Sequence, residues 1–240
     1  MNKRILQLLL LAASFAAPAF AQGDCIAVIG TGSVGGTLGP RFAGLGERIV
    51  YGSRDASQER VQSLVLRTGA DATAVSQAEA AARCSTLVLA VPWNAVEATA
   101  RALGNAEGKL VIDVTNPLGV RNGREVALEV PGGVSGGEYW QSLLKGAKVV
   151  KAFNTVNFRV MADPAVAGGP VSIPLAGDDT AAKARVAMLV TGIGLEPIDV
   201  GPLRTARYTE AMALLYVSRL VSGQPPFEFH LRSRSTKPSP

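Results

Sequence analysis

CIAVIGTGSVG, residues 25–35, is the stretch that decides the fold. Its first part, Cys25–Gly30, is apolar throughout, as expected for a strand that is covered on both faces. An apolar helical pattern follows over Val34–Leu45, and glycine stands at positions 30, 32 and 35 between the two. A G-x-G-x-x-G motif that links a strand to a helix is typical of a dinucleotide-binding loop.

Each glycine of this loop has a physical role. Gly30 permits the tight turn, Gly32 lets backbone N–H groups approach a pyrophosphate, and Gly35 lets the helix lie close to the strand. The helix N-terminus adds unsatisfied N–H groups and the positive end of the helix dipole. We predict that the loop binds a pyrophosphate, and the alternative is a purely structural glycine turn. The residues predicted to bind the cofactor here are Gly30, Thr31, Gly32, Ser33, Val34 and Gly35.

Downstream, short β-rich runs alternate with helical stretches, which is the pattern of βαβ units. This predicts an α/β fold of the Rossmann type, a doubly wound, mostly parallel sheet in a single domain spanning residues 22–222. Strands are expected over residues 25–30, 48–52, 72–75, 86–91, 110–114, 148–153, 171–176 and 195–200, and helices over 34–45, 57–67, 77–83, 95–103, 139–144, 181–191 and 206–221. The glycine-rich stretch 119–137 is expected to form loops near the ligand. The segment 223–240, rich in Pro, Ser and Arg, is expected to be a loose tail.

The end of the second strand predicts which dinucleotide is bound. An NAD site usually places a carboxylate there for the ribose 2′-hydroxyl. This chain has Ser53 and Arg54, and a hydroxyl with a guanidinium can bind a 2′-phosphate that a carboxylate would repel. Asp55 follows directly, and a shift of one residue would favour NAD instead. We therefore predict that the chain binds NADP. In the alternative interpretation, Arg54 is only a solvated surface charge.

Three more strand ends open on the same edge as the glycine loop. Pro92 and Trp93 follow the fourth strand, Asn116 follows the fifth, and Asn154 follows the sixth. A polar residue at the end of an apolar strand indicates ligand contact. Trp93 is equally well explained as core packing.

The first residues, Met1–Ala21, have the pattern of a secretory signal peptide: two cations, a short apolar run and an A-x-A site. Its cleavage would leave no segment able to span a membrane and would place the protein in the periplasm or outside the cell. A misassigned start codon would instead make it cytoplasmic. Removing two cations lowers the net charge from +5 to +3, and no basic patch interleaved with aromatics is present, so nucleic-acid binding is not expected.

The two cysteines, Cys25 and Cys84, precede the first and fourth strands. In the usual strand order, 3-2-1-4-5-6, these strands are neighbours, so both residues lie at the edge opposite the cofactor. They form either a disulfide, in an oxidising compartment, or a pair of small buried apolar residues. With His230 as the single histidine, no metal site is expected.

The motifs GTGSVG, YGSRD, LAVPW, DVTNPL, VVKAFNTVN, LAGDD and IDVGPL occur in this order from Cys25 onward. The chain thereby resembles the NADP oxidoreductases that use the 8-hydroxy-5-deazaflavin coenzyme F420. Its N-terminal part is also similar to the catalytic domain of pyrroline-5-carboxylate reductase and to the cytosolic domain of the STEAP metalloreductases.

The resemblance implies hydride transfer between NADP(H) and a flavin-like or deazaflavin acceptor. It implies that the 2′-phosphate is held by Ser53 and Arg54. No catalytic acid or base is implied, because hydride passes directly between stacked rings. A non-catalytic exported dinucleotide-binding protein is the alternative. A homodimer through the apolar helix Ala206–Val221 is one further interpretation. The resemblance places the nicotinamide near Pro92, Trp93, Leu118 and Phe158.

Overall fold

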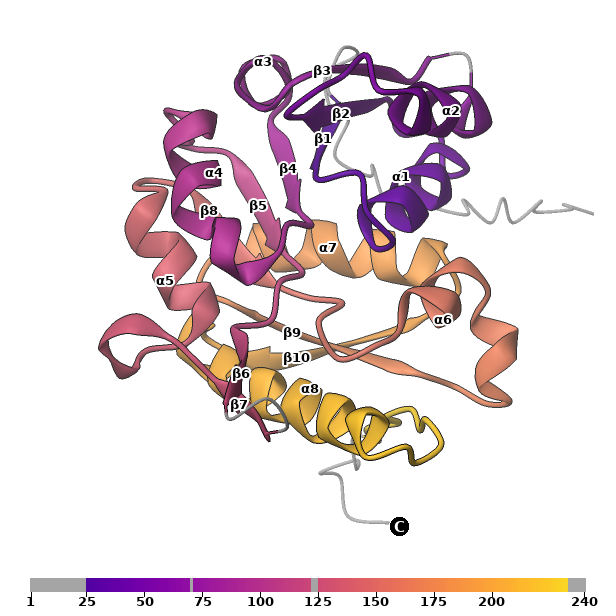
Figure 1. Cartoon of the computed structure of the whole chain (residues 1–240), viewed down its shortest axis with the longest axis vertical. Helices are drawn as coiled ribbons and strands as arrows, with labels where there is room; N and C mark the ends of the chain where they lie inside the picture. Colours follow the sequence, from indigo (N-terminus) through magenta and orange to yellow (C-terminus); the bar gives the residue numbers. More distant parts are fainter. Residues whose placement is uncertain (1–24, 70, 122–124, 233–240) are drawn as a thin grey trace, which may run out of the picture.

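The computed structural model describes residues 25–69, 71–121 and 125–232, and the predicted signal peptide lies outside them. Eight strands form one sheet in the order β3-β2-β1-β4-β5-β8-β9-β10 (Figure 1). All neighbours are parallel except β8 and β9, which are antiparallel. The mostly parallel, doubly wound sheet predicted from the sequence is therefore confirmed, including the 3-2-1-4-5-6 order of its first six strands.

The elements follow the expected alternation along the chain. The strands of the main sheet are β1 (Ile26–Ile29), β2 (Ile49–Ser53), β3 (Thr73–Ser76), β4 (Thr86–Leu89), β5 (Leu110–Asp113), β8 (Lys148–Lys151), β9 (Ser172–Gly177) and β10 (Glu196–Gly201). The helices are α1 (Gly35–Ala43), α2 (Glu59–Thr68), α3 (Gln77–Arg83), α4 (Val96–Leu103), α5 (Gly136–Leu143), α6 (Phe158–Ala162), α7 (Thr180–Gly192) and α8 (Ala206–Val221).

Two apolar cores lie on the two faces of the sheet, because successive side chains of a strand point to opposite faces. In β1, Ile26 and Val28 join a core with residues of α1, α2, α6 and α7. Ala27 and Ile29 join the other core with residues of α3, α4 and α5. This two-sided burial explains why the central strands read as continuous apolar runs.

The stretch 119–137, expected as loops, instead contains a hairpin. Its strands β6 (Leu118–Arg121) and β7 (Glu125–Leu128) pair antiparallel, and β7 packs against α8. Each strand has only four residues and only one face to bury, so the hairpin depends on this tertiary contact rather than on a strong local pattern.

The start of the predicted loose tail is packed onto the domain, which corrects the expectation as far as residue 232. The backbone N–H of Ser172 in β9 donates to the Phe229 carbonyl at 2.9 Å, and Leu231 N–H donates to the Ser172 hydroxyl at 2.9 Å. Phe227 lies against the Tyr216 ring of α8, with 5.7 Å between ring centroids. Ring contacts and hydrogen bonds to β9 thus hold a segment whose Pro and Arg content indicated a loose chain.

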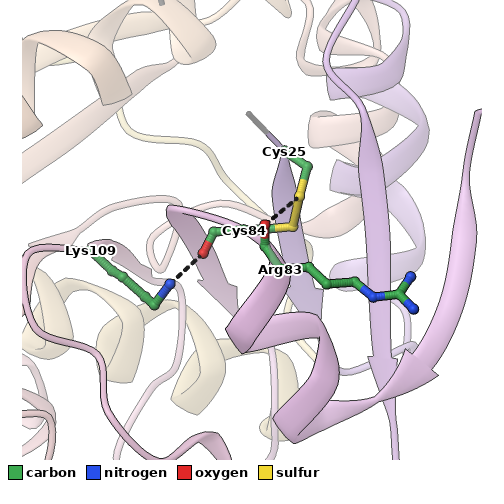
Figure 2. Close-up of a disulfide and its surroundings, with 4 residues drawn as sticks. All are labelled: Cys25, Arg83, Cys84 and Lys109. Carbon is green, nitrogen blue, oxygen red and sulfur yellow. Dashed lines mark hydrogen bonds between the residues drawn. A yellow bond between two sulfur atoms is a disulfide. The ribbon is translucent and has the colours of Figure 1, made fainter. Parts of the chain in front are cut away.

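A disulfide joins Cys25 and Cys84, so the structure favours the first of the two alternatives predicted for this pair (Figure 2). Their Cα atoms are 4.8 Å apart and both side chains are buried. Since Ile26 of β1 and Thr86 of β4 are register partners, the bond ties the amino ends of two neighbouring parallel strands. This is the sheet edge opposite the glycine loop, as expected from the strand order.

In α8, the helix predicted to form a homodimer interface, Tyr216 contacts the Phe227 ring of the same chain and is only 8% exposed. Leu215 beside it is 59% exposed, and the homodimer stays a prediction. Across the described residues, no helix combines the length and the apolar character needed to cross a membrane.

Candidate functional site

A cavity of about 940 Å³ lies along the carboxyl ends of β1, β2, β4 and β5. In an open parallel sheet this edge, where the strand order reverses, is where ligands bind. Most of the residues predicted to bind a cofactor share this cavity. They are Gly30, Thr31, Gly32, Ser33, Val34, Ser53, Arg54, Pro92, Trp93 and Asn116.

The glycine loop forms the cavity wall at the end of β1. Gly30 has a φ of +106°, and a Cβ there would collide with the Ala90 carbonyl. A Cβ at Gly35 would collide with the Gly30 carbonyl, so Gly35 serves the close packing of α1 and is not part of the wall. Gly32 lines the cavity, and a Cβ there would meet no atom of the described chain within 4 Å. The turn at Gly30 and the close packing at Gly35 are as predicted, and the approach of a pyrophosphate at Gly32 stays a prediction.

The start of α1 is prepared for an anion. Val34 precedes the helix without a side-chain cap, and the first turn carries no acidic residue. The Gly36 and Thr37 N–H groups donate to the Gly32 and Val34 carbonyls at 2.7 and 3.1 Å, and no acidic side chain neutralises the positive end of the helix dipole. This arrangement can hold a pyrophosphate.

Two guanidinium groups line the cavity, one directly after β2 and one in α2. Arg54 is exposed and lines the cavity beside Ser53. Arg60, in the first turn of α2, also lines the cavity and donates to the Thr31 hydroxyl at 3.2 Å. The sequence pattern does not indicate Arg60, because only the fold brings it to a loop residue 29 positions away.

Asp55, the competing ribose ligand, is not among the residues that line the cavity. Its carboxylate accepts from the hydroxyl of Ser57 at 2.7 Å and from the Ser57 N–H at 3.0 Å. These hydrogen bonds hold the pKa of Asp55 below its usual value. Arg54 and Arg60 line the cavity beside the end of β2 and no carboxylate does, which is a charge pattern suited to an anion.

The other end of the cavity lies beyond β4 and β5. The Trp93 indole N–H donates to the Glu129 carbonyl at 2.7 Å, and its ring lies 5.8 Å from that of Tyr139. Trp93 is therefore both a wall residue and a packing residue. Leu118 and Phe158, which the resemblance placed near the nicotinamide, are not part of this wall. They belong to the β6–β7 hairpin and to the start of α6.

A fully buried lysine lies behind this end of the cavity. Lys151 Nζ is 2.7 Å from an Asp113 carboxylate oxygen and 2.8 Å from one of Glu210, and it donates to the Thr115 carbonyl at 2.8 Å. Burial alone would lower the pKa of Lys151, but the two carboxylates hold it above its usual value. Glu210 also accepts from the first two backbone N–H groups of α5, at 3.0 and 3.2 Å. The lysine is therefore charged. Its ion pairs connect β8 with Asp113 of β5 and Glu210 of α8, and Glu210 extends the network to α5.

Two members of this ion-pair cluster, Asp113 and Lys151, hold Thr115, a residue of the cavity wall. Its N–H and hydroxyl both donate to Asp113, at 2.8 and 2.7 Å. Its hydroxyl accepts from the Trp140 indole at 3.1 Å, while its carbonyl accepts from Lys151. Every polar atom of Thr115 is thereby held, so the wall beyond β5 is preorganised.

Asn116, the next wall residue, is paired with Asn154 at the end of β8. The Asn116 Nδ2 donates to the Asn154 carbonyl at 2.8 Å, and the Asn154 Nδ2 donates to the Asn116 Oδ1 at 3.0 Å. Both asparagines predicted from the strand ends are thus brought together, although only Asn116 lines the cavity. In the described part of the chain, no group of three or more His, Cys, Asp or Glu side chains is placed to hold a metal ion.

Comparisons with known proteins place this geometry in a family. The profile of the family described as "NADP oxidoreductase coenzyme F420-dependent" matches residues 25–117. The F420-dependent NADP reductase of Methanocaldococcus jannaschii is 30% identical over 205 residues, which cover 80% of this chain and 90% of that protein. A crystal structure from Arthrobacter sp. FB24, provisionally described as an F420-dependent NADP reductase, is 32% identical. It superposes with a TM-score of 0.79, covering 88% of this chain and all of that one.

The metalloreductase STEAP3 of Rattus norvegicus is 28% identical over 190 residues, and this chain spans only 36% of its length. The likeness to the F420-dependent reductases, in contrast, covers nearly the whole of those proteins. The glycine loop, the strand order and this full-length likeness agree. The chain therefore belongs to the family of F420-dependent NADP reductases, whose members are NADP-dependent oxidoreductases.

Proposed function

We propose that this protein transfers hydride between NADP(H) and a flavin-like or deazaflavin acceptor. The observation that carries the proposal is a single cavity that joins a pyrophosphate loop, two guanidinium groups and a preorganised polar wall. The relatives named as F420-dependent NADP reductases support a deazaflavin as the acceptor class.

In this proposal, the residues of the chain bind NADP(H) and orient it. Ser53, Arg54 and Arg60 hold the 2′-phosphate and the glycine loop before α1 holds the pyrophosphate, which is supported by their sharing one cavity. The wall of Thr115 and Asn116 limits where the nicotinamide end can lie. When bound, NADPH supplies the hydride. The contribution of the protein is to fix the distance and orientation between the two rings, without a side-chain acid or base.

The cofactor preference is tested by titrating the mature protein with NADPH and with NADH. Arg54→Ala should weaken NADPH binding by about 30-fold, because a charge-assisted contact is lost, and leave NADH binding nearly unchanged. Arg101→Ala, which removes an exposed guanidinium on α4 away from the cavity, is the matched control. Equal affinity of the wild type for both dinucleotides would contradict the NADP proposal.

The acceptor is tested by following NADPH oxidation with FMN, with a deazaflavin, and without an acceptor. Turnover that depends on the acceptor supports the hydride-transfer proposal. Tight NADPH binding with no turnover on either acceptor would overturn it and favour a non-catalytic dinucleotide-binding protein.

We further propose that the chain is exported and that its mature form begins at Gln22. Two observations support this: the signal-peptide pattern of Met1–Ala21 and the buried disulfide, which is a feature of oxidising compartments. Mass spectrometry of the native protein tests it. An N-terminus at Met1 with two free thiols would contradict export.

A further inference from the structure

The segment 224–232, which we call the strap, follows α8 and is fastened to the domain near both of its ends (Figure 1). Near its start, the Arg219 Nε of α8 donates to the Pro225 carbonyl at 3.0 Å. Near its end, the backbone N–H of Ser172 in β9 donates to the Phe229 carbonyl at 2.9 Å. A segment held by a few surface hydrogen bonds and ring contacts can open while the rest of the domain stays folded.

The strap lies at the edge of the sheet that carries the cavity. β9 runs antiparallel to β8, so Ser172 at the start of β9 lies beyond the carboxyl end of β8. His230 of the strap is 3.2 Å from Glu196 at the start of β10. Phe227 packs on Tyr216 of α8. The strap therefore covers the junction of α8 with the starts of β9 and β10.

A carboxyl group is enclosed in the middle of the strap. Glu228 stands between Phe227 and Phe229, whose rings meet edge to face with 5.0 Å between centroids. Its Oε2 atom is buried and has no hydrogen-bond partner among the described residues. A buried polar group without a partner is costly, and an ionised one is far more costly. Docking therefore favours the protonated carboxyl, and burial raises the pKa of Glu228 accordingly.

The charged and titratable side chains around the strap do not compensate a negative charge on Glu228. These side chains are Arg219 and Tyr216 of α8, Arg159 of α6, Glu196 of β10 and His230 of the strap itself. None of them donates to the buried Glu228 oxygen. Arg219 lies over the Phe227 ring, 5.8 Å from its centroid, and His230 is placed against Glu196. Burial raises the pKa of Tyr216, and the Glu228 charge raises it further, so Tyr216 offers no positive charge to Glu228.

We propose that the strap is a pH-sensitive cover: it is docked on α8 and β9 while Glu228 carries its proton, and it is released as Glu228 ionises. The docked carboxyl holds its proton more tightly than the released one, so docking is favoured in acid and weakens as pH rises. The coupling is reciprocal, because docking strengthens proton binding by the same factor by which ionisation weakens docking. Release uncovers the Tyr216 ring, which is 8% exposed while the strap is docked.

Amide hydrogen exchange, measured by NMR between pH 4 and pH 8, tests the release. The Ser172 N–H reports docking, because its acceptor is the Phe229 carbonyl of the strap. Wild type and Glu228→Gln are compared at each pH, which cancels the pH dependence of the chemical exchange step. Protection of this amide in the wild type, relative to the variant, should fall by about tenfold as pH rises, because the ionised carboxylate has no donor. The amide of Val88, in the buried strand β4, should show no such fall.

Glu196→Gln is the matched control, because it removes the carboxylate beside His230 and leaves Glu228 in place. The fall in Ser172 protection should persist in this variant. Wild-type protection that does not change with pH relative to Glu228→Gln would overturn the proposal. A pH dependence that disappears in Glu196→Gln and persists in Glu228→Gln would also overturn it, since the switch would then be His230.

A second measurement applies even where Glu228→Gln itself releases the strap. The Glu228 carboxyl carbon is titrated by ¹³C NMR in the wild type and in Phe227→Ala, which removes the ring that packs on Tyr216. Glu228 should titrate above the ordinary glutamate range in the wild type and return to that range in the variant. Ordinary titration in the wild type, or the same raised titration in both proteins, would contradict the coupling between docking and ionisation.

Discussion

Replacing Cys25 and Cys84 together by alanine removes the covalent link between β1 and β4, and we expect it to destabilise the fold strongly. The bond joins residues 59 positions apart. For a loop of this length, the chain-entropy relation gives a contribution of about 4 kcal/mol to the free energy of unfolding. For a domain of this size, such a loss corresponds to a fall of about 10 °C in the melting temperature.

The measurement is equilibrium unfolding in urea, made on the oxidised wild type, the wild type kept reduced, and the double alanine variant. The reduced wild type retains both sulfur atoms, so its difference from the oxidised protein isolates the cross-link from the loss of side-chain volume. The slope of the free energy against urea should also rise when the bond is absent, because a chain without the cross-link exposes more surface on unfolding.

The NADPH affinity of the same three proteins serves as the internal control. The bond lies at the amino ends of β1 and β4, opposite the cavity, so NADPH affinity should change little under conditions where the variant is folded. A difference of less than about 1 kcal/mol between the oxidised and reduced wild type would refute the reasoning. A large loss of NADPH affinity with unchanged stability would refute the separation of the bond from the site.

Three further changes test other parts of the structure. Lys151→Met leaves two buried carboxylates without their cation and should cost about 3–5 kcal/mol in urea unfolding, whereas Lys148→Met, on the half-exposed start of the same strand, should cost less than about 1 kcal/mol. Arg60→Ala should weaken NADPH about fivefold in a fluorescence titration without weakening NADH, and an equal effect on both would show that Arg60 does not face the 2′-phosphate. Burial raises the pKa of Glu228, so the folded protein holds this proton more tightly than the unfolded chain, and this contribution to stability is lost as pH rises through the raised value. Glu228→Gln should therefore be more stable than wild type at neutral pH and should lose this advantage below pH 4; an advantage that persists in acid would contradict the assignment.

The parts of the fold that the sequence predicted are those set by local patterns. The continuous apolar runs indicated strands covered on both faces, and the glycine spacing indicated a loop between Ile29 and α1. The β6–β7 hairpin and the docked segment up to residue 232 could not be predicted in this way. Both are stabilised by side chains distant in the sequence: β7 packs on α8, and Phe227 packs on Tyr216.

In the candidate site, too, the residues set by a local pattern could be predicted, whereas those brought in by distant parts of the chain could not. Ser53 and Arg54 were predicted because they directly follow a strand, and they line the cavity. Arg60 was missed because the pattern marks it only as a charge on an amphipathic helix. Lys151 was missed for a related reason. Its partners, Asp113 and Glu210, lie 38 and 59 residues away, and nothing local distinguishes a paired buried lysine from one at a strand edge.

The hydrogen bonds at the strand ends separate a residue whose polar atoms are all paired from one whose side-chain oxygen is not, and the sequence cannot do this. Thr115 and Asn154 are both polar residues that follow apolar strands, so the pattern treats them alike. In the structure, all polar atoms of Thr115 are used by Asp113, Trp140 and Lys151, and its role is to shape the cavity. Asn154 is equally buried but keeps one acceptor unused among the described residues. A complete polar network such as that of Thr115 fixes the position of the residue, whereas the unpaired oxygen of Asn154 does not contribute to its own positioning, so two residues with the same sequence pattern differ in how firmly they are held.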